Sequence, residues 1–166
     1  MKKINAALIS LLITTAMMAQ NDSIQPPYKK FPIYPPVKLL LPDNTSYFSK
    51  ADLDKKSPVM LMLFNPQCEH CQHETEALTT HIENFKHIQI IMATSMPFDS
   101  MMAFRERYHL EKYKNIVVGQ DTHYFLSTFF MIRSLPFLAF YNKKKELISV
   151  FEGGMPMHLI LKEFEK

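Results

Sequence analysis

Glycine is scarce in this sequence of 166 residues, which has only three glycines, at positions 119, 153 and 154. Loops that cradle phosphate groups need several closely spaced glycines, because only glycine lets the backbone approach the phosphates so closely. No stretch of this sequence has that spacing. Glycine-rich phosphate loops are therefore excluded, and we expect no nucleotide site.

An excess of charge of one sign is also lacking. The formal net charge is +3, and no part of the chain concentrates the lysines and arginines, so we expect no nucleic-acid partner. Apolar residues make up 47% of the chain and include 13 phenylalanines and 12 methionines. This is enough to form the core of one domain, which excludes a disordered chain and a miniprotein held together by disulfides.

The first nineteen residues differ from the rest of the chain. A basic start precedes a largely apolar run at residues 4–18, and Ala19 is followed by polar residues. This order is typical of a secretory signal peptide, and the run is shorter than the roughly 18 residues of a membrane-spanning helix. We expect a signal peptide at residues 1–19 and a periplasmic or secreted protein, with an uncleaved membrane anchor as the alternative.

Proline marks the next segment. Six of the eleven prolines fall between Gln20 and Pro42, and proline fixes φ and removes a backbone donor. We expect an extended, proline-rich lead-in at residues 20–36, followed by an edge strand at residues 37–41.

From residue 57 onward, strand and helix patterns alternate. Continuous apolar runs predict buried strands, and apolar residues at helical spacing predict helices packed on them. The predicted strands are residues 59–64, 88–93, 116–118 (ended by Gly119), 137–141 and 147–151; the predicted helices contain residues 71–85, 101–108, 121–132 and 156–164. The order β-α-β-α-β-α-β-β-α predicts an α/β fold with a central mixed sheet flanked by helices.

The residues with reactive side chains lie together where the first buried strand meets the first helix, in the run Cys68-Glu69-His70-Cys71. The amide groups and dipole at a helix start favour a thiolate. Two cysteines three residues apart on a helical turn face the same way and can form a disulfide. We expect Cys68, at the exposed end, to attack and Cys71, one turn further in, to resolve the mixed disulfide.

Three neighbouring residues bear on the redox chemistry of this pair. Protonated His70 would favour the thiolate, whereas the carboxylate of Glu69 would favour the thiol, so the sequence does not set the redox poise. Glu74, three residues after Cys71, is a candidate for carrying a proton to or from that thiol. The alternative for Glu74 is a first-turn acid that only favours the helix dipole.

These residues resemble the thioredoxin superfamily. The strand–CxxC–helix unit is followed by Ser134-Leu135-Pro136 before a strand hairpin, and Glu74 follows the second cysteine. With the signal, this pattern is similar to the extracytoplasmic TlpA/ResA-like thiol–disulfide oxidoreductases over residues 37–166. The resemblance implies a thioredoxin fold with Cys68 as nucleophile and Cys71 as resolving thiol. It also implies that Glu74 is the acidic residue of the site.

The same resemblance assigns a role to Leu135 and Pro136. It implies that Pro136 follows a cis peptide bond, faces the dithiol and, with Leu135, receives the substrate backbone. A cis bond before proline is uncommon, so a cis bond at this position is a specific prediction.

Three positions depart from the family pattern. Gln67 stands where an aromatic residue usually precedes the first cysteine, and Met62 stands where cytoplasmic thioredoxins keep a buried aspartate. His70 replaces the proline of the reducing members and resembles the Cys-Pro-His-Cys pair of disulfide-forming oxidases. The direction of electron flow therefore stays open.

The sequence thus predicts a secreted thiol–disulfide oxidoreductase that acts on protein thiols and disulfides. We expect a monomer with no organic cofactor and no metal, which exchanges electrons with a membrane or periplasmic redox partner protein. A peroxidase is disfavoured, because it needs a threonine where Asn65 stands. The remaining alternatives are a structural disulfide, which would close only a small loop, and a docking or copper-delivery module using Cys68, His70, Cys71 and His73.

Overall fold

The structure, a computed structural model, describes residues 25–166. The signal peptide predicted at residues 1–19 and the first residues of the lead-in lie outside the described residues. The helices and strands are α2 (Pro27–Lys30), β1 (Leu39–Leu40), β2 (Tyr47–Phe48), β3 (Val59–Leu63), α3 (Glu69–Thr80), β4 (Gln89–Thr94), α4 (Phe98–Arg107), β5 (Ile116–Gln120), α5 (Phe125–Phe130), β6 (Phe137–Tyr141), β7 (Leu147–Glu152) and α6 (Met157–Glu163). Short 3-10 turns lie at Lys50–Asp52, Ile82–Phe85 and Leu110–Lys112.

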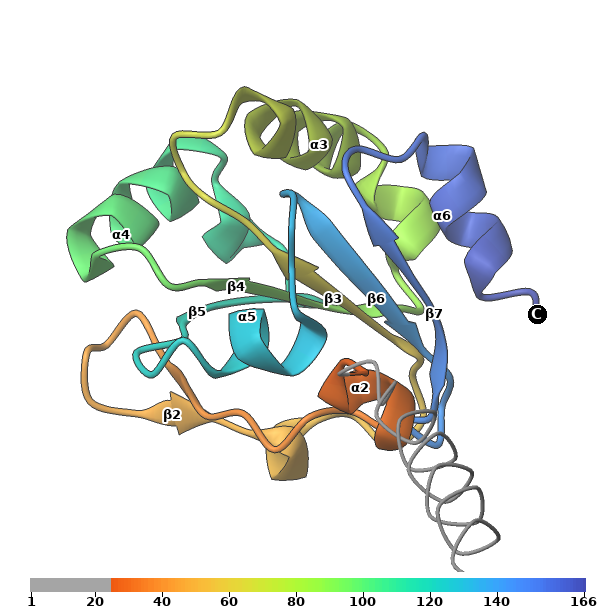
Figure 1. The fold of residues 1–166 in the computed structure, drawn as a ribbon. Helices are drawn as coiled ribbons and strands as arrows, with labels where there is room; N and C mark the ends of the chain where they lie inside the picture. Colours follow the sequence, from red (N-terminus) through yellow and green to blue (C-terminus); the bar gives the residue numbers. More distant parts are fainter. Residues whose placement is uncertain (1–24) are drawn as a thin grey trace, which may run out of the picture.

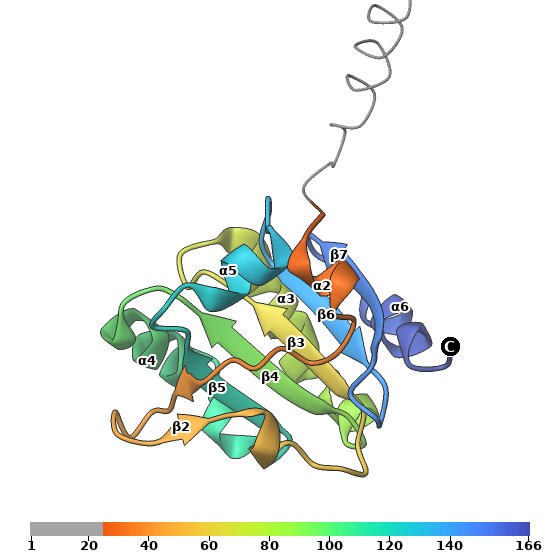
Figure 2. The ribbon, with the colours of Figure 1, turned by 60° about the horizontal axis from the view of Figure 1, so that its bottom comes forward.

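The strands form one mixed sheet in the order β2-β1-β5-β4-β3-β6-β7. β3, β4 and β5 are parallel, whereas β6 runs antiparallel to β3, and β7 antiparallel to β6. Parallel neighbours need a crossover connection, and α3 and α4 supply it. Figure 1 shows α3, α4 and α6 on one face of the sheet and α2 and α5 on the other, and Figure 2 shows that second face. The predicted element order and mixed sheet are confirmed.

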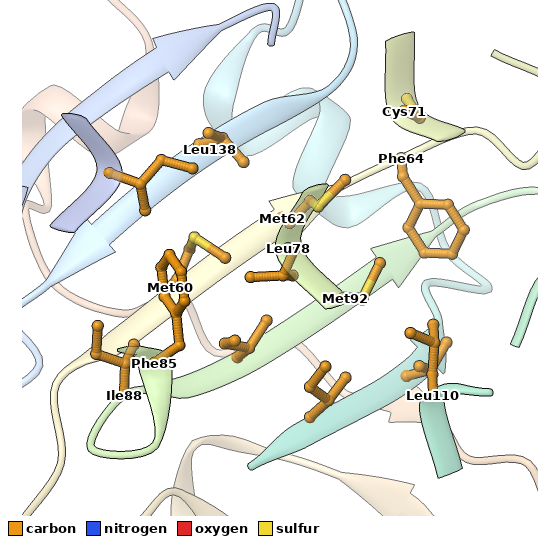
Figure 3. Close-up of a cluster of buried hydrophobic side chains, with 14 of the residues drawn as sticks. Met60, Met62, Phe64, Cys71, Leu78, Phe85, Ile88, Met92, Leu110 and Leu138 are labelled. Carbon is orange, nitrogen blue, oxygen red and sulfur yellow. The ribbon is translucent and has the colours of Figure 1, made fainter. Parts of the chain in front are cut away.

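The central strand β3 is buried on both faces, which explains its unbroken apolar sequence. Met60 and Met62 point into the core beneath α3, and Leu61 and Leu63 point into the core beneath α5. Figure 3 shows the first of these cores, with Cys71 of α3 among its members. Packing on both sides fixes the carboxyl end of β3, from which the chain enters the CxxC segment.

The lead-in differs from the prediction at one point. An extended chain was expected, but Pro27–Lys30 forms the single turn of α2. Proline is tolerated at the start of a helix, because its missing N–H would have no partner there. Tyr28 packs on Phe130 of α5, with ring centroids 5.6 Å apart, so α2 is held by the domain. The extended expectation is wrong for this turn.

Two strand predictions also need correction. The strand expected at the edge, β1, is second from the edge, because β2 pairs outside it. β5 does not end at Gly119 but continues to Gln120. A Cβ at position 119 would lie 2.7 Å from the Cβ of Leu39, so this glycine lets β1 approach β5 and does not terminate the strand.

The helix expected over residues 121–132 is shorter than predicted. The N-cap of α5 is Tyr124 and not Asp121 as expected, but the Asp121 side chain accepts hydrogen bonds from the first two backbone N–H groups of the helix, those of Phe125 (3.1 Å) and Leu126 (2.8 Å). The helix ends at Phe130, because Met131 adopts a left-handed conformation with φ of 52°. The predicted helix through residue 85 likewise ends at Thr80 and gives way to a 3-10 turn.

Candidate active site

A tight turn after β3 places Cys68 at the N-cap of α3. The carbonyl of Asn65 accepts the N–H of Cys68 at 3.0 Å, and its side-chain oxygen accepts the N–H of Gln67 at 2.9 Å. The side-chain amide of Gln72 donates to the carbonyl of Pro66 at 2.9 Å. These bonds hold Cys68 by the backbone, independently of any bound substrate.

The two cysteines come within 3.4 Å of each other and both are free thiols. Cys68 is partly exposed, whereas Cys71 is completely buried in the core beneath α3. Burial raises the pKa of the Cys71 thiol to about 12, and the charge of Glu74 acts in the same direction. Cys71 is therefore a protonated thiol at neutral pH and needs a base before it can attack a disulfide.

Glu74 is the buried acid beside this pair, with an exposed fraction of 7%. One carboxyl oxygen, Oε2, accepts the backbone N–H of Met155 at 3.0 Å. The other, Oε1, has no hydrogen-bond partner among the described residues. Burial raises the pKa of Glu74 to about 7, against the lowering effect of the Met155 N–H. This carboxyl group therefore changes its protonation state near neutral pH.

A small pocket connects Glu74 to the surface. It measures about 300 Å³ and is lined by Glu74 together with His70, His73 and Met157. Both histidines are exposed. Glu74, one turn after the buried thiol of Cys71 on α3, therefore lines a pocket that is open to solvent.

The raised pKa of Glu74 predicts a pH-dependent stability. Between its ordinary value of 4.5 and about 7, the unfolded chain loses this proton while the folded protein keeps it. The contribution of Glu74 to the free energy of unfolding is fully present below pH 4.5. It falls as the pH rises towards 7 and is lost above that pH. After allowance for solvent screening, we expect a loss of about 2 kcal/mol. Urea unfolding of the reduced protein at pH 5 and pH 8 measures it.

Glu74→Gln should remove most of this pH dependence, because the amide does not ionise. Glu76→Gln is the matched control, since Glu76 is an exposed carboxylate on the same helix. The control should behave as the wild type. Equal pH dependence in wild type and Glu74→Gln would contradict the assignment.

The peptide bond between Leu135 and Pro136 is cis, as predicted. Cys68 Sγ donates to the carbonyl oxygen of Leu135 at 3.8 Å. Pro136 itself is buried, and Leu135 is partly exposed. The loop before β6 and the start of α3, 67 residues apart in the sequence, therefore meet at the attacking thiol.

A groove of about 500 Å³ opens at Cys68. Its walls come from the ends of β3 and β4, from α5 and from the Leu135 loop, and they include Met96, Tyr124 and Arg133. The lining is mainly apolar, so the groove suits a segment of protein chain with apolar side chains. None of these three residues was predicted from the sequence. The carboxyl ends of parallel strands share one edge of the sheet, and that rule would have pointed to Met96.

The remaining predicted site residues lie on the surface. Glu69 and His70 are exposed at the start of α3, beside the cysteines but outside the groove.

Met62 is fully buried beneath α3, so the place of the aspartate of cytoplasmic thioredoxins holds an apolar side chain. Among residues 25–166, Glu74 and Asp121 are the buried carboxyl groups, and of the two only Glu74 lies on α3 with the cysteines.

Two further findings concern residues 25–166. No group of three or more His, Cys, Asp or Glu side chains in this range is arranged to hold a metal ion. No helix in the same range has the length and apolar character needed to cross a membrane.

Comparison with solved structures identifies the thioredoxin fold. DsbF of Mycobacterium tuberculosis, solved in mixed oxidised and reduced forms, matches with a TM-score of 0.64 and 17% identity over 77% of this chain and 92% of that one. A secreted disulfide oxidoreductase of the same organism, homologous to E. coli DsbE, matches with a TM-score of 0.64 and 16% identity over 77% and 93%. The reduced 2-Cys peroxiredoxin of Plasmodium vivax matches with a TM-score of 0.60 and 13% identity over 76% and 86%.

A scan against protein-family models and a search of curated proteins each give no match. The structural likeness, at such low identities, therefore defines the fold. The predicted thioredoxin fold is confirmed, and the activity has to be argued from the site.

Proposed function

We propose that this protein is an extracytoplasmic thiol–disulfide oxidoreductase of the TlpA/ResA-like kind, which exchanges its Cys68–Cys71 dithiol with protein substrates. The observation that carries the proposal is the contrast within the pair. Cys68 is partly exposed and lines a mainly apolar groove, whereas Cys71, within 3.4 Å, is buried and does not line it. This arrangement suits one attacking and one resolving thiol.

The first step belongs to Cys68. Its thiolate attacks one sulfur of a substrate disulfide, a mixed disulfide forms, and the other substrate sulfur leaves as a thiolate that takes up a proton. The substrate chain lies in the groove with Leu135 beside the attacked bond, whereas the buried Pro136 that follows it does not line the groove. Cys68 needs no movement of the backbone, because the turn after β3 already holds it at the groove.

The second step belongs to Cys71 and Glu74. Glu74 carboxylate accepts the proton of the Cys71 thiol, and the resulting thiolate attacks Cys68 Sγ. The Cys68–Cys71 disulfide forms, and the substrate leaves with its second sulfur as a thiolate. Two electrons pass from the pair to the substrate. The same steps in reverse oxidise a substrate dithiol, with Glu74 returning the proton.

The reaction needs no organic cofactor and no metal, because the two thiols store the electron pair. A membrane or periplasmic redox partner protein restores the pair after each cycle, and one copy of the chain is sufficient for catalysis. The apolar run and flanking residues of the first nineteen positions support an extracytoplasmic location. DsbF and the secreted DsbE homologue, which share the fold, support the same kind of activity.

Reduction of insulin by dithiothreitol tests the proposal. We expect the mature chain, residues 20–166, to accelerate insulin precipitation severalfold or more over dithiothreitol alone, and Cys68→Ser to abolish the acceleration. If wild type and Cys68→Ser behave alike, and the wild type also fails to oxidise a reduced protein, the redox proposal is refuted. A metal-binding or docking role at the same residues would then be the next hypothesis.

A further inference from the structure

The loop that precedes Pro136 is fastened to the end of β7 by one carboxylate. Oε2 of Glu152 accepts hydrogen bonds from the backbone N–H groups of Arg133 (3.1 Å) and Ser134 (3.0 Å) and from the hydroxyl of Ser134 (3.3 Å). Hydrogen bonds to an ionised acceptor are stronger than those between neutral groups. Glu152 thus fixes two consecutive backbone units immediately before Leu135.

The ion pair of Glu152 contributes little by comparison. Its Oε1 lies 3.6 Å from Nε of Arg133, whose side chain is 89% exposed. Exposed ion pairs of this kind are worth little, because water and salt screen them. The holding effect therefore comes from the two backbone N–H groups and not from the arginine side chain.

Gly153, which follows Glu152, holds the other side of the loop. The N–H of Gly153 donates to the carbonyl of Pro136 at 2.8 Å, and Glu152 itself pairs with Phe137 in the β6–β7 ladder. Leu135 lies between these two attachments and presents its carbonyl to Cys68. The position of Leu135 relative to Cys68 is thus set from the end of β7.

We propose that Glu152 is a positioning residue for substrate binding, which holds the Arg133–Ser134 backbone so that Leu135 faces Cys68 across the groove. This inference rests on the proposed function. Glu152 does not touch the reacting sulfur atoms. Its loss loosens one wall of the groove, whereas Cys68 stays in place because the turn after β3 holds it. Binding of a protein substrate should weaken, and the reactivity of Cys68 towards a small disulfide should not fall, because the Leu135 carbonyl accepts from the Cys68 thiol and its displacement does not disfavour the thiolate.

Three variants test whether Glu152 affects substrate binding without slowing Cys68: Glu152→Ala, Glu152→Gln and the control Glu106→Ala. Glu106 is an exposed glutamate of α4 that lines no part of the groove. For insulin, we expect Glu152→Ala to raise KM about tenfold and change kcat less than about twofold, since charged hydrogen bonds are lost. Glu152→Gln keeps an acceptor oxygen and should raise KM by about threefold. The rate of Cys68 with Ellman's reagent should not fall below the wild-type rate in any of the three variants.

Two results would overturn the inference: an unchanged KM for insulin in both Glu152 variants, or an equal loss of rate with insulin and with Ellman's reagent. Circular dichroism melting checks folding, and if Glu152→Ala is unfolded the comparison of Glu152→Gln with wild type decides. Failure of the wild type to act on insulin would instead refute the proposed function, so the two failures are distinguishable.

Discussion

Cys71→Ser is expected to trap protein substrates on Cys68 as stable mixed disulfides. Cys68 of this variant can still attack, because its position depends on the turn after β3 and not on Cys71. The hydroxyl that replaces the buried thiol cannot attack Cys68 Sγ, so the covalent complex persists. Turnover should fall by more than about a hundredfold, as when an enzyme loses a residue essential to one step.

Non-reducing electrophoresis followed by mass spectrometry measures the trapped complex. The matched control is Cys68→Ser, which retains only the buried thiol and should form no complex. Complex formation through Cys71 in that control would reverse the assignment of the two roles. Absence of any complex with Cys71→Ser would show that Cys68 is not the attacking thiol.

Glu74→Gln is expected to slow release of the substrate while leaving attack by Cys68 unchanged. The pKa of Cys71 is raised to about 12, so at neutral pH its proton must be removed by a base. Positioned general bases typically contribute about a hundredfold or more, and we expect a loss of about that size at pH 7. The mixed disulfide should accumulate in single-turnover experiments.

The pH profile distinguishes proton transfer from a packing effect. Only the ionised carboxylate can accept a proton, and the pKa of Glu74 is about 7, so the wild-type release rate should rise with pH through 7 and then level off. The Glu74→Gln rate should keep rising with pH as hydroxide takes over. Glu76→Gln should match the wild type. A profile that levels near pH 7 in Glu74→Gln would contradict the role of Glu74.

Most of the fold follows from local patterns in the sequence. The continuous apolar run at Val59–Leu63 fits a strand covered on both faces, and the alternating helices define the crossovers. Details that depend on tertiary packing do not follow. Gly119 looks like a strand end in the sequence, yet its role is to admit Leu39 from a segment 80 positions earlier. The turn of α2 depends in part on Phe130.

The residues of the candidate site, too, could be predicted from the sequence only in part. The pair Cys68 and Cys71 could be predicted, because their spacing and their place after a buried strand are local features. The burial of Glu74 could not, since the N–H that binds it belongs to Met155, 81 residues later. Glu152 gave no signal at all, because its bonds depend on the pairing of β6 with β7.

The most direct measurement of the central claim is the redox equilibrium of Cys68 and Cys71 in glutathione and dithiothreitol buffers, read by alkylation and mass spectrometry. We predict a single reversible two-electron transition in which both thiols disappear together. Its potential should fall in the range of catalytic pairs, about −270 to −120 mV. Independent oxidation of the two thiols, no reversible transition, or a potential below about −300 mV, as in structural disulfides, would contradict it.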